Sequence, residues 1–317
     1  MKGIHLTLGR KIYKNTALII FLILWEVLPR IGAVPANFLP PLSIVLKEIL
    51  LEGKEGYLFL NLLLSLYRIM AGLLLATAAG VSAGLVLGYL LPGTAKMLYP
   101  LLRLFGQINP YSLLPLFIVF LGIGESAKIA IVAWTAVWPI LFHTITGAGS
   151  ADIEVLKSAR AMGAGRFQIL RSVILPSAGP AVFDGLRVGV EMAFFVLIAA
   201  EMTGGTGGLG AMVHLSGMNF LINKLFASGV CIVILGVMIN YLLYDLQKRL
   251  FFWKETVRFF QTEKSSGQHK ALGAKGIAFI AILCVVILIG GYYQSLRAFR
   301  LMNDSGAGEE FNHFFSE

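Results

Sequence analysis

Long apolar runs, separated by short polar segments, make up most of the chain. Seven runs carry few charges and cover residues 16–29, 58–91, 97–121, 126–147, 176–203, 226–247 and 276–296. A helix of roughly 20 residues crosses a bilayer hydrocarbon core of about 30 Å. The pattern therefore predicts an all-α polytopic membrane protein with one span in each run.

The interval after the first run is not a simple connection. Prolines at 35, 40 and 41 exclude a continuous helix at its start. Apolar residues then recur at helical spacing from Leu42 to Leu51. We predict a short helix here that lies along the membrane surface.

The third run is interrupted at residues 107–110, Gln-Ile-Asn-Pro. A broken helix is tolerated at membrane depth where it lines a cavity or is buried in protein. Two interpretations stay open. Gln107 and Asn109 lie on a translocation path, or the proline produces a structural kink.

The second run contains small residues at a strict spacing of four. They are Gly72, Ala76, Gly80, Gly84 and Gly88. Such a stripe lets another helix approach closely in a membrane. It predicts packing within the helix bundle, with a dimer seam as the alternative.

A polar island at residues 152–176 separates the fourth and fifth runs. Ser150 and Asp152 suit an N-cap, and Gly163 suits the glycine that ends a helix. Apolar residues lie between them at helical intervals, and a second short helix is expected from about Gly165 to Pro176. The island therefore predicts a helical hairpin with an apolar edge and a basic rim, either a docking element or a solvated connector.

The distribution of Lys and Arg predicts the orientation of the chain. With a cytoplasmic N-terminus, the inside segments hold seventeen basic residues and the outside segments seven. Because cytoplasmic loops are enriched in Lys and Arg, we expect the N-terminus and the 152–176 hairpin to be cytoplasmic. The basic N-terminal segment and first run also resemble a signal peptide, but we expect an uncleaved first span.

Composition supports a membrane protein and excludes several other classes. Hydrophobic residues make up 57% of the chain and charged residues 14%, with a mean hydropathy of +0.80. The net charge of +9 does not indicate a nucleic-acid surface, because the basic residues lie between apolar runs. Cys231 and Cys284 lie inside apolar runs and are interpreted as small buried hydrophobes, so no metal site is predicted.

Ionisable residues inside spans are costly and are candidates for function. Asp184, Arg187 and Glu191 share one face of the fifth span. Either Arg187 neutralises one of the two acids, or Glu191 faces the path unpaired and favours a neutral or cationic solute. Glu201, near the outer end of this span, either shapes the outer mouth or hydrogen-bonds the glycine-rich loop at 204–210.

Nucleotide-binding motifs are weak or absent. The pattern G-x-G-x-x-G at Gly205, Gly207 and Gly210 follows a membrane helix and not a strand, so a dinucleotide role is rejected. The motif G-x-x-x-x-G-K-[ST] does not occur. We therefore expect no ATP or other cofactor on this chain.

Several motifs together resemble one family. SARAMGA at 158–164, followed by VILP at 173–176, resembles the E-A-A-x-x-x-G…I-x-L-P loop of ABC importer permeases, the binding-protein-dependent inner-membrane components. Further motifs resemble the nitrate/sulfonate/taurine-type subfamily; these are FLPP at 38–41, SLYR at 65–68, NP at 109–110, LPL at 114–116, GLR at 185–187, AEM at 200–202 and GLG at 208–210. The resemblance covers roughly residues 15–250.

The resemblance implies that the hairpin couples the permease to an ATP-hydrolysing subunit. In this role Ala159 allows close approach, Gly163 makes the turn, and Leu175-Pro176 sets the entry of the fifth span. Arg160 and Phe167 belong to the same coupling loop. Lys157 stands where the family usually has Glu, and this reversed charge predicts a partner with a more acidic groove.

The C-terminal part departs from the family core. By the resemblance, that core ends near residue 252. The predicted domains are a cytoplasmic N-terminus (1–15), the permease core (16–252, with the coupling loop at 150–175), a basic linker (253–275), an extra span (276–296) and an acidic outer tail (297–317). The extra span is either an accessory anchor or a tether for the substrate-binding protein or a small subunit.

The resemblance implies a type I importer permease fold with six core spans and one extra helix. The expected function is import of a small solute across the inner membrane of a prokaryote, by alternating access and without covalent chemistry in this chain. The expected partners are a second copy, two ABC ATPase subunits that carry ATP and Mg, an extracytoplasmic substrate-binding protein and the lipid bilayer. The alternative is a secondary transporter driven by an ion gradient.

Overall fold

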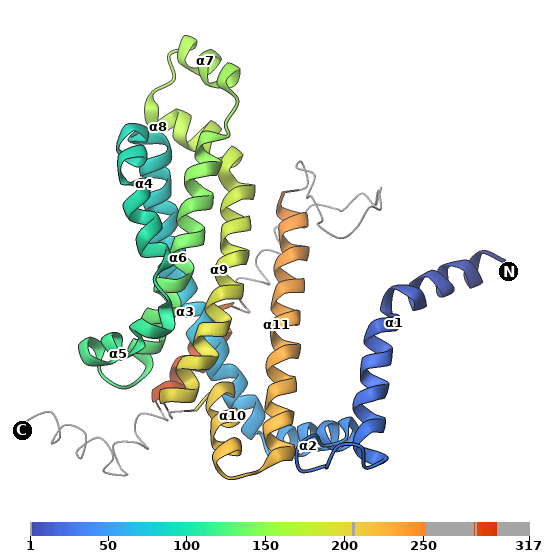
Figure 1. Ribbon diagram of the computed structural model, residues 1–317. Helices are drawn as coiled ribbons and strands as arrows, with labels where there is room; N and C mark the ends of the chain where they lie inside the picture. The colour runs from blue at the N-terminus through green and yellow to red at the C-terminus, as the bar shows by residue number, and fades with distance from the viewer. Residues whose placement is uncertain (1, 205–206, 252–281, 283, 297–317) are drawn as a thin grey trace, which may run out of the picture.

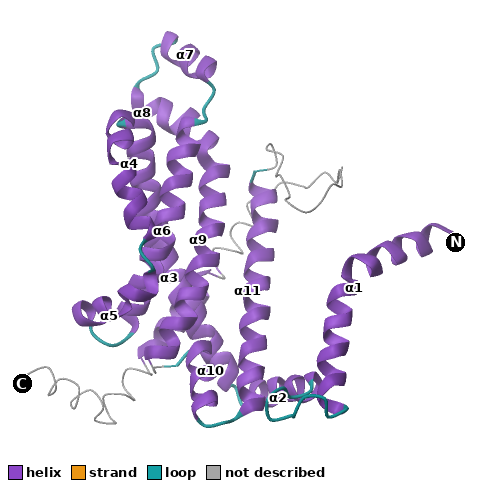
Figure 2. Ribbon diagram, viewed as in Figure 1, coloured by secondary structure: helices purple, strands orange, loops and turns teal. Residues whose placement is uncertain are grey.

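The computed structural model describes residues 2–204, 207–251, 282 and 284–296. This part of the chain is built from helices and connecting loops and contains no strand (Figure 2). The all-α architecture predicted from the apolar runs is therefore confirmed for the described residues.

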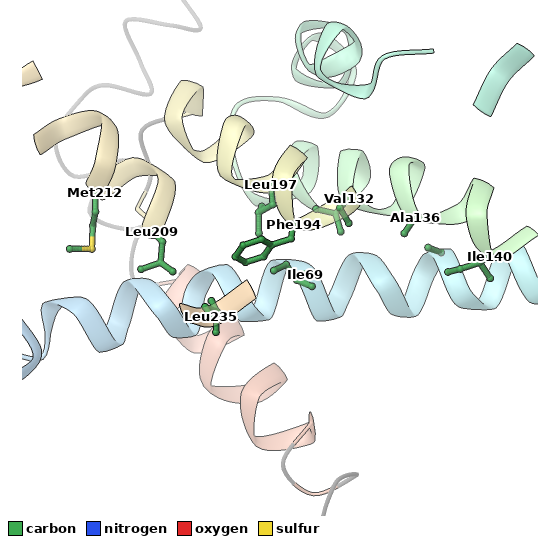
Figure 3. Packing of buried hydrophobic residues seen from close by; sticks show 11 residues of the cluster. Ile69, Val132, Ala136, Ile140, Phe194, Leu197, Leu209, Met212 and Leu235 are labelled. Carbon is green, nitrogen blue, oxygen red and sulfur yellow. The ribbon is translucent and has the colours of Figure 1, made fainter. Parts of the chain in front are cut away.

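Three long helices form the centre of the molecule. They are α3 (Tyr57–Leu85), which continues as the π-helical turn η1 (Val86–Leu90), α6 (Glu125–Gly149) and α9 (Leu175–Gly204), and they lie side by side (Figure 1). The core between them contains Ile69 from α3, Val132 and Ile140 from α6, and Leu197 from α9, each at most 2% exposed (Figure 3). The apolar faces of all three helices therefore meet in one core.

The small-residue stripe of α3 lies against α6. A Cβ added at Gly72 would stand 2.4 Å from the Val132 side chain, and one added at Gly84 would stand 2.5 Å from the Thr144 side chain. Gly80 and Gly88 meet α6 in the same way, and Ala76 is 1% exposed in the same core. The stripe therefore packs within the bundle. Its small residues are covered by α6 and do not form a dimer seam.

The third apolar run does not form one gently kinked span. It folds as α4 (Pro92–Gln107) and α5 (Pro110–Leu121), and the two helices meet at 86°. The side chain of Asn109 accepts a hydrogen bond from the N–H of Tyr111 at 3.0 Å and so caps α5. The break combines a proline, which cannot continue the helix, with a polar cap that starts a new one.

The remaining helices lie around this centre. The first helix, α1, covers Lys2–Arg30 and therefore begins well before the expected span at 16. The predicted surface helix is α2 (Leu42–Lys54), joined to α1 where Glu26 accepts hydrogen bonds from Ser43. The short helix α10 (Leu209–Met218) leads into α11 (Ile222–Leu250).

The described helices account for the expected core spans. By length and composition, α3 with η1, α6 and α11 are able to cross a membrane, and the bent pair α4–α5 is a fourth candidate. The helix α9 is equally long, with 30 residues, and differs in carrying Asp184, Arg187, Glu191 and Glu201. With α1, these helices correspond to the six predicted core spans.

A C-terminal helical segment, Cys284–Leu296, packs on α3. A Cβ at Gly291 would lie 2.1 Å from Tyr67 Cβ, and the rings of Tyr67 and Tyr292 are 6.5 Å apart. The predicted linker at 253–275 and tail at 297–317 lie outside the described residues. The extra helix is therefore attached to the core by a close, specific contact.

Candidate functional site

The first arm of the predicted hairpin is α7 (Ile153–Ala161). Asp152 caps it, because its side chain accepts a hydrogen bond from the N–H of Glu154 at 2.8 Å. Gly163 ends it with a positive φ of 80°, a conformation that glycine adopts without a Cβ penalty. The predictions for Asp152 and Gly163 are confirmed. The other N-cap candidate, Ser150, is instead the C-cap of α6 and donates to the carbonyl of Gly147 at 2.8 Å.

The second arm is continuous with the next long helix. It begins as α8 (Arg166–Ile169), widens to a π-helical turn, η2 (Leu170–Ile174), and enters α9 at Leu175. Pro176 has no N–H and cannot donate the bond that a regular helix needs at this point. The π turn directly before it accommodates this break.

The inner face of the hairpin packs on the ends of the central helices. Ala159, only 7% exposed, joins Ile169 and Ile174 in a cluster with Ala148 at the end of α6. The resemblance implied that Ala159 allows close approach. In this chain Ala159 faces inward, and its small side chain brings α7 close to the chain's own helices.

The outer face carries large apolar side chains. Their exposed fractions are 66% for Ile153, 48% for Val155, 80% for Met162 and 75% for Phe167. Basic residues surround them and are also exposed; they are Lys157, Arg160, Arg166 and Arg171. We call the four apolar residues and this basic rim the hairpin surface. It stands beyond the ends of α4, α6 and α9 (Figure 1).

A buried charge network lies nearer the opposite end of the long helices. Arg68, fully buried in α3, donates from Nε and Nη2 to the two carboxylate oxygens of Glu125, at 2.7 and 2.6 Å. Its Nη1 donates to Glu201 of α9 at 2.7 Å and to the carbonyl of Gly207 at 2.8 Å. One guanidinium thus joins α3, α6, α9 and the glycine-rich loop.

The same network anchors the start of α10. Glu201 accepts from the N–H of Gly210 at 2.9 Å, Ser65 Oγ from the N–H of Leu209 at 3.0 Å, and Asn61 Oδ1 from the N–H of Gly208 at 2.7 Å. A Cβ at Gly208 would collide with the Glu201 carboxylate, and one at Gly210 with the carbonyl of Ile198. The glycines of this loop therefore permit close packing on Glu201. The expected hydrogen bond between Glu201 and the loop is confirmed.

Sequence reasoning missed Arg68 and Glu125 as members of this network. The available signal was an arginine inside an otherwise apolar run, 11 residues from the start of α3. Its partners are 57 and 133 residues away in sequence. A buried cation requires nearby anions, but only the packing of the three helices identifies which ones.

The charges of the fifth span form a second polar network, with α11. Asp184 accepts from Gln247 Nε2 at 2.5 Å, and Glu191 accepts from Asn240 Nδ2 at 2.7 Å. Between them Arg187 lies 5.7 Å from the centre of the Tyr244 ring. We call these three contacts the α9–α11 ladder, since they follow one another along two antiparallel helices.

The predicted pairing of Arg187 with one of the two acids is confirmed for Glu191, because Arg187 Nε lies 3.7 Å from Glu191 Oε1 as an i,i+4 ion pair. Asp184 bonds to Gln247 instead. The alternative of an unpaired Glu191 is wrong, because Asn240 also bonds to it. The tertiary contact with α11, which the sequence does not reveal, satisfies both acids.

The five residues predicted for a translocation path do not form one network among the described residues. Gln107 and Asn109 are exposed at the α4–α5 bend, and Asn109 caps α5. Glu201 is fully buried with Arg68. Arg187 and Glu191, with side chains 33% and 43% exposed, belong to the α9–α11 ladder.

These features define a polytopic α-helical membrane subunit with a projecting helical hairpin. Residues 80–252 match the family model of the binding-protein-dependent transport system inner membrane component, and the chain belongs to this family. The match includes the hairpin and ends before the C-terminal helix. It confirms the resemblance found in the motifs.

Curated relatives cover the same part of the chain. The taurine transport system permease protein TauC of Escherichia coli (strain K12) is 32% identical over 247 residues, which cover 76% of this chain and 89% of that protein. The putative aliphatic sulfonates transport permease protein SsuC of Bacillus subtilis (strain 168) is 30% identical over 240 residues, covering 75% and 86%. The nitrate import permease protein NrtB of Synechocystis sp. (strain ATCC 27184 / PCC 6803 / Kazusa) is 26% identical over 192 residues, covering 59% and 68%.

A solved structure shows the same fold. A chain of the inward-facing MetNI methionine ABC transporter aligns with a TM-score of 0.54 at 21% identity, covering 62% of this chain and 97% of that chain. The type I ABC importer permease fold expected from the resemblance is thus confirmed. The chain is an ABC importer permease of the inner membrane.

Proposed function

We propose that this chain couples ATP hydrolysis by a partner ATPase to alternating access of a solute pathway. The observation that carries the proposal is the hairpin surface. Four large apolar side chains are exposed on a segment whose inner face is fully packed. Outside the bilayer, exposed apolar side chains of this size indicate a protein contact.

The hairpin is built to transmit force. Its second arm continues through η2 into α9 without a loop, and its first arm follows α6 by a three-residue connection. A displacement of α7 is therefore transmitted to α6 and α9, two of the three helices of the central core. This continuity supports a coupling role over that of a solvated connector.

The proposed assembly contains two copies of this chain, two ATPase subunits and an extracytoplasmic substrate-binding protein. ATP and Mg bind to the ATPases, and no cofactor binds to this chain. The N-terminus and the hairpin are proposed to be cytoplasmic, as the distribution of basic residues predicts. The C-terminus is then extracytoplasmic.

The proposed solutes are small oxyanions or oxyanion-bearing molecules. Relatives are named for the transport of taurine, aliphatic sulfonates, nitrate and bicarbonate. These solutes share a negatively charged group with several oxygen atoms. The shared chemistry supports the class, while the individual solute is set in large part by the binding protein.

Copurification and uptake test the proposal. The tagged permease is coexpressed with a candidate ABC ATPase from the same organism and captured in detergent. We expect Met162→Asp and Phe167→Asp to reduce the captured ATPase by about tenfold, as buried anchors of an interface do. Ser172→Asp adds the same charge to the second arm at an exposed position and should leave capture unchanged.

Uptake into proteoliposomes separates the two transport classes. ATP-dependent uptake that persists with ionophores and disappears in Met162→Asp supports the proposal. Uptake that follows an imposed ion gradient without the ATPase overturns it and indicates a secondary transporter.

Lys157 gives a further test of the contact. An acidic groove in the ATPase predicts that Lys157→Glu weakens capture. Strengthened capture by this variant would contradict the acidic groove while leaving the hairpin contact itself intact.

A further inference from the structure

We propose that the C-terminal helix, Cys284–Leu296, is an autoinhibitory support of α3. It holds the end of the bundle opposite the hairpin together and so limits ATP hydrolysis by the partner ATPase. The helix lies outside the match to the family model, which ends at residue 252. The restraint on α3 follows from contacts within this chain, and its effect on ATP hydrolysis rests on the proposed function.

One side of the C-terminal helix is suited to close packing. Gly291 and Ser295 are buried and lie four positions apart, and the half-buried Ile287 and Leu288 lie on the same side. Small residues at this spacing let two helices approach closely in a membrane. The opposite side, which includes Ile289, is exposed. The helix therefore contacts the bundle through a single face.

Tyr67 of α3 is the centre of this contact. A Cβ at Gly291 would lie 2.1 Å from Tyr67 Cβ, so a residue larger than glycine forces the two helices apart. The Tyr67 ring is 6.5 Å from the ring of Tyr292, and the Tyr67 hydroxyl interacts with the Ser295 side chain. Three residues of the C-terminal helix thus contact one residue of α3.

At this level α3 lies between α6 and the C-terminal helix. Tyr67 precedes Gly72 by five positions, and Gly72 faces Val132 of α6. At 3.6 residues per turn, this separation corresponds to a rotation of about 140° beyond one full turn. The C-terminal helix and α6 therefore pack on nearly opposite sides of α3.

The supported half of α3 is the half that carries the Arg68 network, at the end of the bundle away from α7 (Figure 1). No residue from 61 to 73 is exposed, whereas Leu74 and Leu75, nearer the hairpin, are 56% and 57% exposed. Tyr67 directly precedes Arg68, and its hydroxyl interacts electrostatically with Arg68 and Glu125. Displacement of the C-terminal helix would therefore uncover α3 beside this charge pair.

Packing on two sides restrains α3 more than packing on one, because densely packed side chains transmit strain and resist displacement. With the C-terminal helix in place, bending of α3 is confined to the part beyond residue 73, and Arg68 keeps its ion pairs with Glu125 and Glu201. Closure of the ATPases displaces the hairpin and, through it, α6 and α9. A firmly held Arg68 end opposes this displacement and so slows hydrolysis.

Two reporter cysteines on α6 test the restraint on the permease alone, in nanodiscs. Ala127→Cys lies near the Arg68 end and Ala148→Cys near the hairpin, and the two alanines are 1% and 4% exposed. Each is placed in a Cys231→Ala, Cys284→Ala background and labelled with a water-soluble maleimide. We expect Gly291→Val to raise the labelling rate of the first reporter about tenfold, as local opening does, and to change the second by less than about twofold.

Gly290→Ala is the matched control on the same helix. An added Cβ at Gly290 would lie 3.3 Å from Leu63 Cδ2, the end of a flexible side chain that can move aside. This variant should leave both labelling rates unchanged. Gly291→Ala, whose Cβ meets Tyr67 Cβ, should raise labelling of the first reporter in the same direction as Gly291→Val.

ATP hydrolysis is measured on the permease bound to the candidate ABC ATPase in nanodiscs, without the substrate-binding protein. Gly291→Val should raise the rate about threefold, which corresponds to about 0.6 kcal/mol. A second variant combines Leu63→Cys and Gly290→Cys in the cysteine-replaced background. A short bifunctional methanethiosulfonate then fixes the helix to α3, and the rate should be lower than in the same sample after reduction.

An unchanged labelling rate of the first reporter in Gly291→Val would overturn the restraint. An equal rise at both reporters would also overturn it, because that result marks a general loss of stability. Raised labelling with unchanged hydrolysis, or a cross-link without effect on hydrolysis, would overturn the autoinhibition. Failure of the wild-type permease to bind the ATPase counts against the proposed function instead, and labelling of the permease alone then decides the restraint.

Discussion

The strongest effect on stability is expected from Glu201→Gln. This substitution replaces one carboxylate oxygen with an NH2 group in a fully buried side chain. Glu201 accepts hydrogen bonds from Arg68 at 2.7 Å, Ser65 at 2.8 Å and Gly210 at 2.9 Å. Glutamine supplies one acceptor oxygen in place of two and adds an NH2 group among three donors. Among the described acidic residues that pair with Arg68, only Glu125 then keeps its charge.

The magnitude follows from the burial of the pair. Removing one partner from a buried ion pair costs about 3–5 kcal/mol, and the retained amide oxygen places Glu201→Gln at the lower end, about 3 kcal/mol. For a protein of 150–250 residues, each kcal/mol shifts the midpoint of thermal unfolding by about 2–4 °C. We expect a midpoint lowered by about 6–12 °C.

The assay is thermal unfolding of the purified protein, followed by size-exclusion chromatography of the surviving fraction. Glu125→Gln is the matched control. The Glu125 side chain is 20% exposed, so water compensates for part of the lost charge and the midpoint should fall less. A second readout is maleimide labelling of a cysteine at Ser216, a buried position of α10, after replacement of Cys231 and Cys284. Labelling should rise in Glu201→Gln, because the start of α10 loses its anchor.

The reasoning is refuted if Glu201→Gln changes the midpoint by less than about 2 °C, or if Glu125→Gln has the larger effect. Either result would mean that the charge of Glu201 is compensated by something other than Arg68 and the N–H of Gly210.

Three further predictions concern close packing and backbone conformation. Gly84→Ala places a Cβ 2.5 Å from the Thr144 side chain and should destabilise the α3–α6 contact by about 1–3 kcal/mol. Gly93→Ala is the control in the same unfolding assay. It should leave stability unchanged, because a Cβ at Gly93 has no atom within 4 Å. Gly163→Ala places a side chain on a residue with φ +80°, at a cost of about 1–2 kcal/mol, and should reduce capture of the ATPase. Gly165→Ala is the control, because Gly165 is an N-cap with φ −69°, and this variant should retain capture of the ATPase. Gly291→Val meets Tyr67 and should detach the C-terminal helix, so that Cys284 reacts faster with maleimide in a Cys231→Ala background; Gly229→Val, in open space, should leave the rate unchanged.

Local signals in the sequence predicted the hairpin well. Capping by Asp152 and the turn at Gly163 depend on residues only a few positions apart, and both were found as expected. Local information did not reveal which face of α7 points outward. Ala159 lies inward because Ile169 and Ile174 return to it from the second arm, and that contact forms only when the hairpin closes.

Long-range polar contacts escaped prediction for a related reason. Asp184, Arg187 and Glu191 lie on one helical face, which suggested pairing within the helix. The partners that satisfy the two acids, Gln247 and Asn240, come from α11. The spacing of residues within a helix indicates which side chains of that helix can contact one another. It does not indicate which residues of another helix pack beside them.

The sequence by itself determined the membrane character, the apolar spans, the hairpin and the family, because each is encoded in composition, short-range periodicity or a local motif. Only the tertiary structure decided the 86° bend between α4 and α5, the enclosure of Arg68 by two distant acids, and the contacts of Asp184 and Glu191 with Gln247 and Asn240 of α11. The physical reason is that a buried charge is stabilised by whichever groups surround it, and those groups are brought together by helix packing over more than a hundred residues of chain.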